Sequence, residues 1–217
     1  MKRTFGWMAA LTLLAASAPA QAPDPHAGHG HPVPAPVPAP APAPAPAPAA
    51  PTGPGSGAAK YFGDIPLVDQ DGRQVRLYSD LLKGKSVVID VMFTSCTGVC
   101  PVLSGTFAKI QDHVGDRLGK DVLLLSFSVD PVNDTPAKLK EYAARFKARP
   151  GWYFLTGSKE NVDAALKKLG QYVENREAHQ NLFIIGNEPT GLWKKAFGLA
   201  KPEELFPIVD SVLNDKG

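Results

Sequence analysis

Four short apolar runs, separated by amphipathic segments, constrain the fold of this chain most strongly. The runs are rich in β-branched and aromatic residues, as buried strands are. We place these strands at residues 86–93, 122–129, 151–155 and 181–185. Helical spacing of apolar residues marks the segments between them. Strands that alternate with helices in this way predict an α/β fold around a central sheet.

Helix signals locate the intervening segments. Apolar residues recur on one face of residues 101–118, Thr135-Pro136 opens a second helix, and Ser158 caps a third that Gly170 ends. A hairpin around Asp71-Gly72 comes before the first strand. A further strand at 192–197 and a helix at 202–213 follow the last one. This is the element order of a thioredoxin-like fold with an amino-terminal hairpin extension.

The first 22 residues have the pattern of a secretory signal peptide. Lys2 and Arg3 precede a mostly apolar run that ends in small-x-small cleavage options. The run is shorter than the roughly 20 residues that a membrane span needs. We therefore predict that residues 1–22 are cleaved and that the chain is exported, to a periplasm or the outer face of the cytoplasmic membrane. Retention as an anchor is the minority alternative, and we expect no transmembrane span after processing.

Residues 23–58 read as a flexible linker dominated by alternating proline and alanine. Such a segment has no apolar face to bury and is expected to be extended and solvated. His26, His29 and His31 lie near its start and could bind Cu(II) or Zn(II) weakly. The alternative, which the sequence supports equally, is that these histidines are only the polar start of a linker. Residues 59–217 then form one globular domain.

The net charge of the chain does not indicate a class of binding partner. Of the 23 Lys and Arg in the chain, removal of Lys2 and Arg3 leaves 21, against 21 Asp and Glu. The mature chain is thus near neutral, and without a basic stripe we predict no nucleic-acid binding. We expect a monomer.

The only two cysteines, Cys96 and Cys100, lie where the first strand gives way to a helix, with Pro101 behind them. A disulfide across so short a loop would restrict the unfolded chain little, so a structural staple is disfavoured. Pro101 suits the first helical position, which puts Cys100 at or next to the cap. Because a helix start favours a thiolate, we expect both thiols to have depressed pKa values.

A metal site needs a third ligand, and the domain offers two histidines. His113 lies in a helix and reads as a solvated surface residue, whereas His179 directly precedes a buried strand. Two thiolates and one imidazole form a soft, low-coordinate set that suits Cu(I), and Cu(II) if an oxygen ligand joins. Asp130, which follows the second strand, is either an auxiliary group of this site or a turn residue.

Three segments together carry a family resemblance: "FTSCTGVCPVLSGTF", "LLLSFSVDPVNDTPAKLKEYA" and "HQNLFIIG". In this order they resemble the Sco (SenC) family of thioredoxin-like copper chaperones. The resemblance implies copper bound by Cys96, Cys100 and His179, and delivery or preparation of copper for the CuA site of cytochrome c oxidase. The partner would be the oxidase subunit that carries CuA, or another envelope copper protein. Ala178 departs from the acidic residue that often precedes the histidine in this family, and "GNEPTG" departs from the usual Asp-Gly turn.

Other functions remain open on sequence grounds. A thiol-disulfide oxidoreductase would cycle Cys96 and Cys100 as a redox dithiol, although its usual motif is one residue shorter and faces a cis-proline that is missing before Asn181. A peroxidase is a third hypothesis, since thioredoxin-like scaffolds also carry peroxide chemistry. A purely structural interaction domain is the fourth.

Overall fold

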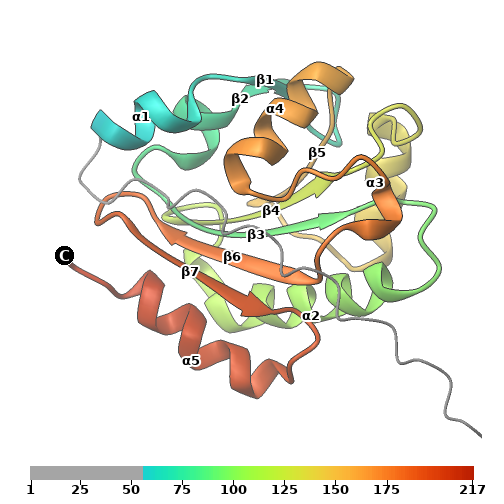
Figure 1. Ribbon diagram of the computed structural model, residues 1–217. Helices are drawn as coiled ribbons and strands as arrows, with labels where there is room; N and C mark the ends of the chain where they lie inside the picture. Colours follow the sequence, from blue (N-terminus) through green and yellow to red (C-terminus); the bar gives the residue numbers. More distant parts are fainter. Residues whose placement is uncertain (1–55) are drawn as a thin grey trace, which may run out of the picture. The chain divides into compact units, whose positions relative to one another are not determined.

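The computed structural model describes residues 56–217, and a five-stranded mixed sheet is its centre (Figure 1). The strand order is β5-β4-β3-β6-β7. The three strands β3, β4 and β5 are parallel, while β6 is antiparallel to both β3 and β7. The sheet strands are β3 (Ser86–Met92), β4 (Val122–Ser128), β5 (Trp152–Leu155), β6 (Leu182–Asn187) and β7 (Leu192–Phe197).

Helices cover both faces of the sheet, because strands buried on both sides need apolar cover on both sides. Figure 1 shows α2 and α5 on one side and α1 and α4 on the other. Apolar residues of α3 join the layer of α2 and α5. The bounds are α1 (Ser56–Phe62), α2 (Val99–Val114), α3 (Pro136–Arg145), α4 (Lys159–Leu169) and α5 (Pro202–Leu213). None of these helices is long and apolar enough to cross a membrane.

The predicted hairpin is confirmed. Strands β1 (Pro66–Val68) and β2 (Gln74–Arg76) pair antiparallel around a turn in which Gly72 has φ +79°. Val68 also forms a β-bridge with Thr156, which follows β5, so the hairpin contacts the chain at the β5 edge of the sheet. Two elements near it were not predicted: helix α1 and the π-helix η1 (Leu77–Leu82).

The helix predicted at residues 101–118 begins and ends earlier than expected. Gly98 is the N-cap of α2, so Cys100 is the second helical residue and not the cap. Pro101, third in the helix, still needs no N–H partner there. At the other end Gly115, with φ +55°, ends the helix, and a 3-10 turn η2 (Gly115–Arg117) follows.

Helix α4 is capped as predicted, and its cap offers a test of local stability. The Ser158 hydroxyl accepts a hydrogen bond from the Asn161 N–H, 3.3 Å away. Replacing Ser158 by alanine should lower the free energy of unfolding by about 1 kcal/mol, because that N–H loses its partner. Ser158→Asp, which can cap and also favours the helix dipole, should keep wild-type stability. Urea denaturation measures the stability of both variants. Equal midpoints for Ser158→Ala and wild type would show that the Ser158 cap does not stabilise α4.

Candidate functional site

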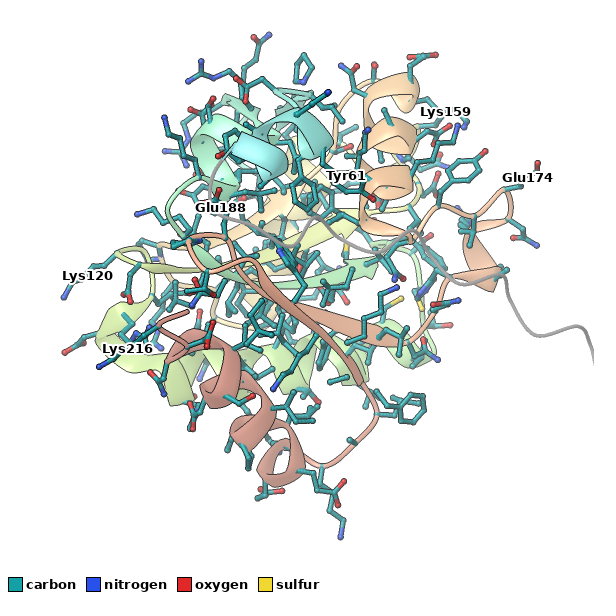
Figure 2. All side chains as sticks on the ribbon, turned by 60° about the vertical axis from the view of Figure 1, so that its left-hand side comes forward. Tyr61, Lys120, Lys159, Glu174, Glu188 and Lys216 are labelled. Carbon is teal, nitrogen blue, oxygen red and sulfur yellow. The ribbon has the colours of Figure 1, made fainter. Side chains whose placement is uncertain are left out.

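The topology brings three separate segments to one edge of the sheet. The parallel strands β3 and β4 end at this edge, and the antiparallel β6 begins there. Cys96 follows β3, Asp130 follows β4 and His179 precedes β6. All three predicted positions of the domain therefore converge, although they are up to 83 residues apart in the sequence. In Figure 2, Glu174, in the segment before His179, and Glu188, which follows β6, lie on opposite sides of the domain.

The two thiols are in different environments. Both are free; Cys100 is fully buried, whereas Cys96 is half-buried and lines an open pocket. Burial, together with a hydrogen bond that the Cys100 thiol donates to Cys96, raises the pKa of Cys100 to about 12. The prediction of a depressed pKa is wrong for this thiol, because loss of hydration outweighs the favourable helix start.

His179 faces the buried thiol. Its Nε2 lies 3.7 Å from Sγ of Cys100, and only 9% of the residue is exposed. Burial lowers the pKa of His179, which favours the neutral imidazole with a free lone pair. Its buried Nδ1 finds no hydrogen-bond partner among residues 56–217. The ring of Phe93 lies edge-on to the imidazole with centroids 6.0 Å apart. The geometry thus places a soft nitrogen donor against a sulfur.

Asp130 is committed to its own turn and to a cation. Both carboxylate oxygens accept from the Asn133 side chain, at 2.9 and 3.0 Å, and its N–H donates to Ser128 Oγ. One of these oxygens also forms an ion pair with Arg176. Asp130 therefore acts as a turn residue, and its carboxylate also pairs with the guanidinium of Arg176.

Sequence reasoning missed two residues that shape this edge. Arg176 carries no motif signal, yet its guanidinium lies over the Phe93 ring, 4.9 Å from the centroid, as well as beside Asp130. Asp134, which the sequence did not single out, accepts hydrogen bonds from Thr94 and from Ser128. It thereby fixes the chain just before the cysteine loop. Neither role could be read from local sequence, since Thr94 is far from Asp134 along the chain, and Phe93 and Asp130 are far from Arg176.

The remaining histidines are elsewhere. His113 packs against α5: its ring stacks on Phe206 with centroids 4.2 Å apart, and Nε2 lies 2.8 Å from Oδ1 of Asp210. His113 is therefore an exposed residue, as predicted, whose ring also packs on Phe206. His26, His29 and His31, like the expected signal peptide, lie outside the described residues.

The arrangement is a pair of thiols with an adjacent imidazole rather than a finished metal cage. Within residues 56–217, no three His, Cys, Asp or Glu side chains are close enough together to hold an ion as they stand. Yet Cys96, Cys100 and His179 share one edge, and Cys96 and His179 line the same open pocket. Fold and site together define a thioredoxin-like domain with a Cys-x-x-x-Cys dithiol and a facing histidine.

Comparison with known proteins places this class further. The family model SCO1/SenC matches residues 54–189. The SCO1 protein homolog of Bacillus subtilis is 36% identical over 125 residues, which is 54% of this chain and 63% of that relative. The chain therefore aligns with less than two thirds of that protein's length. This chain belongs to the SCO1/SenC family.

Solved structures agree with the fold. BsSco, described as having a disulfide switch and as a member of the Sco family of cytochrome c oxidase assembly proteins, superposes with a TM-score of 0.59 at 31% identity. That comparison covers 71% of this chain and 94% of BsSco. Copper-bound ScoI of Bradyrhizobium japonicum superposes with a TM-score of 0.58 at 26% identity, covering 70% and 99%. The predicted thioredoxin-like α/β fold is confirmed.

Proposed function

We propose that this protein binds one copper ion as cargo, through Cys96, Cys100 and His179, and delivers or prepares it for the CuA site of cytochrome c oxidase. The observation that carries this proposal is His179 Nε2 facing Cys100 Sγ at 3.7 Å, in a chain of the SCO1/SenC family. Thiolate and neutral imidazole are ligands that suit Cu(I). Copper-bound ScoI gives a precedent for the metal, and the description of BsSco gives one for the oxidase.

Each of the three residues has a distinct part in such a site. Cys100 and His179 form its inner side, because both are buried and face each other at 3.7 Å. Cys96 is half-buried at the pocket and is the ligand that an incoming partner can reach. Copper replaces the thiol protons on binding, and its positive charge then stabilises the buried thiolates. A partner's thiols would approach on the side of Cys96.

The proposal extends to the rest of the chain. Residues 1–22 are a cleaved signal peptide that directs export to the periplasm or the outer face of the cytoplasmic membrane, and residues 23–58 are a flexible linker that precedes the domain of residues 59–217. The domain acts as a monomer. His26, His29 and His31 gather metal weakly for it. Support for these statements comes from the sequence pattern alone.

Anaerobic copper titration tests the metal site. The reduced chain should bind one Cu(I) at the three residues, and X-ray absorption should show both sulfur and nitrogen ligands. His179→Ala should lose the nitrogen contribution and bind at least about tenfold more weakly, because even groups that only orient ligands are worth that much. Unchanged affinity and ligation in His179→Ala would rule out the three-ligand site. His113→Ala, which alters a histidine packed on α5, is the matched control and should bind as wild type.

Thiol-disulfide exchange is the second candidate, favoured by the unequal exposure of the two free thiols. The Cys96 thiolate would attack a substrate disulfide, which releases one substrate thiolate and leaves a mixed disulfide. Cys100 would then attack Cys96 sulfur, lose its proton, release the second thiol and close a Cys96–Cys100 disulfide. Reduction of a target protein that survives His179→Ala but not Cys100→Ser would favour this reading. BsSco, with its disulfide switch, is a precedent.

A further inference from the structure

The segment that carries His179 contains a single helical turn. This turn, η3 (Arg176–Ala178), lies between α4 and β6. The His179 N–H donates to the Arg176 carbonyl at 3.4 Å, so the two residues are at opposite ends of one turn. The Asn175 side chain accepts from the Glu177 N–H at 3.0 Å and starts it. Any group that fixes Arg176 therefore also fixes the backbone at His179.

Arg176 is fixed from the side of the cysteines. Its guanidinium pairs with Asp130, whose side chain is 9% exposed and already anchored in the turn after β4. The same guanidinium lies 4.9 Å from the Phe93 centroid. Phe93 directly follows β3 and begins the loop that leads to Cys96. One side chain thus joins the histidine segment to the ends of both strands at this edge.

Phe93 completes a closed set of contacts. Its ring touches the guanidinium of Arg176 and, edge-on, the imidazole of His179. The ring lines the same pocket as Cys96, Arg176 and His179. Planar guanidinium groups pair with carboxylates and lie on aromatic faces at once, which a lysine ammonium does less well. Lysine should therefore preserve the charge but not the whole contact.

We infer that Arg176 is a positioning residue that clasps the histidine segment, through Asp130 and Phe93, so that His179 stays against Cys100. This inference rests on the proposed copper site. While the clasp is closed, His179 is held as a ligand and copper is retained. When it is open, the site has only its two sulfurs and releases Cu(I) faster. Arg176 touches no metal ligand's donor atom; it acts through the turn and through Phe93.

The decisive experiment compares Cu(I) release from the full reduced chain carrying one Cu(I). Transfer to an excess of bathocuproine disulfonate is followed for wild type, Arg176→Gln and Arg176→Lys. Arg176→Gln should release copper about ten- to a hundredfold faster, the range seen for groups that orient metal ligands. Its X-ray absorption should show a reduced nitrogen contribution. Arg176→Lys should fall between the two. Glu174→Gln, an exposed change in the same segment, is the matched control and should match wild type.

A metal-free measurement keeps this inference separate from the proposed function. In the copper-free chain, hydrogen exchange at the His179 amide should be faster in Arg176→Gln and unchanged in Glu174→Gln. Wild-type release rates, nitrogen ligation and exchange in Arg176→Gln would overturn the inference. If the unaltered chain binds no Cu(I), the proposed function fails instead. The exchange rates then decide whether Arg176 holds the segment at all.

Discussion

Replacing Cys100 by serine is expected to weaken Cu(I) binding by at least about a hundredfold, more than the loss of a group that merely orients a ligand. A hydroxyl is a hard donor that keeps its proton, whereas Cu(I) prefers a soft thiolate. Cys100 is also the thiol that faces His179, at 3.7 Å, so its replacement removes the buried sulfur beside the imidazole. Competition with a Cu(I) chelator measures the affinity.

The control for this variant lies in the same loop. Thr97 is exposed between the two cysteines, and Thr97→Ala should bind copper as wild type does. Thermal unfolding of the copper-free Cys100→Ser chain shows whether the buried serine is tolerated. A folded Cys100→Ser chain with wild-type affinity would show that copper, if bound, is held elsewhere.

Removing the carboxylate of Asp90 should change how stability depends on pH. Asp90 lies in β3, is 2% exposed, and neither of its oxygens has a hydrogen-bond partner among the described residues. Burial raises the pKa of Asp90 from 3.8 to about 7, an effect that nearby Ser126 only partly offsets. A change of that size corresponds to roughly 4 kcal/mol at most. This is the largest effect on stability that we expect from one side chain.

The direction follows from where the proton is held. Between about pH 4 and pH 7, the unfolded carboxyl is ionised while the folded one keeps its proton. The free energy of unfolding should therefore fall as pH rises through this window, and the loss is complete above it. The neighbouring Cys100 and Tyr142 have raised pKa values and stay neutral throughout. Asp90→Leu cannot ionise and should not show this loss. Its free energy of unfolding minus that of wild type should therefore be larger at pH 8 than at pH 5, by a few kcal/mol, and Asp90→Leu should be the more stable protein at pH 8.

Urea denaturation at pH 5 and pH 8 measures this. Asp90→Asn, which keeps the shape but cannot ionise, should flatten the pH profile in the same way. Asp116→Asn, a change of an exposed aspartate, is the control and should keep the wild-type profile. Identical pH profiles of wild type and Asp90→Asn would show that the buried carboxyl is not a source of this pH dependence.

Local pattern was sufficient for most of the sheet. Strand β7 was predicted with its observed bounds, and β3 differs by only one residue at its end. These segments are apolar because they are buried, so composition and position agree. Helix α1 was missed, since its burial depends on contacts with distant elements such as η1 and α4. Helix α2 was placed two residues late, because Pro101 was taken as the first helical residue and Gly98 was not taken as the cap.

The site shows the same division at the level of single residues. Spacing and residue type identified Cys96, Cys100 and His179, because so few soft ligands are present in the domain. The pKa of Cys100 is raised and not depressed as predicted, because the thiol is buried. Burial depends on tertiary packing, which the sequence pattern does not record. Arg176 gave no signal, because Asp130 and Phe93 reach it only after two strands and a loop have met.

The sequence by itself determined the α/β order, the dithiol at a strand end and the candidate histidine, because periodicity, cap residues and rare ligand types are local properties of the chain. Only the tertiary structure decided that His179 faces Cys100, that Cys100 is buried, and that Arg176 joins the segments around them. Those facts depend on distances between residues far apart in sequence. Such distances are fixed by strand pairing and by the loss of water around each group, which no local pattern records.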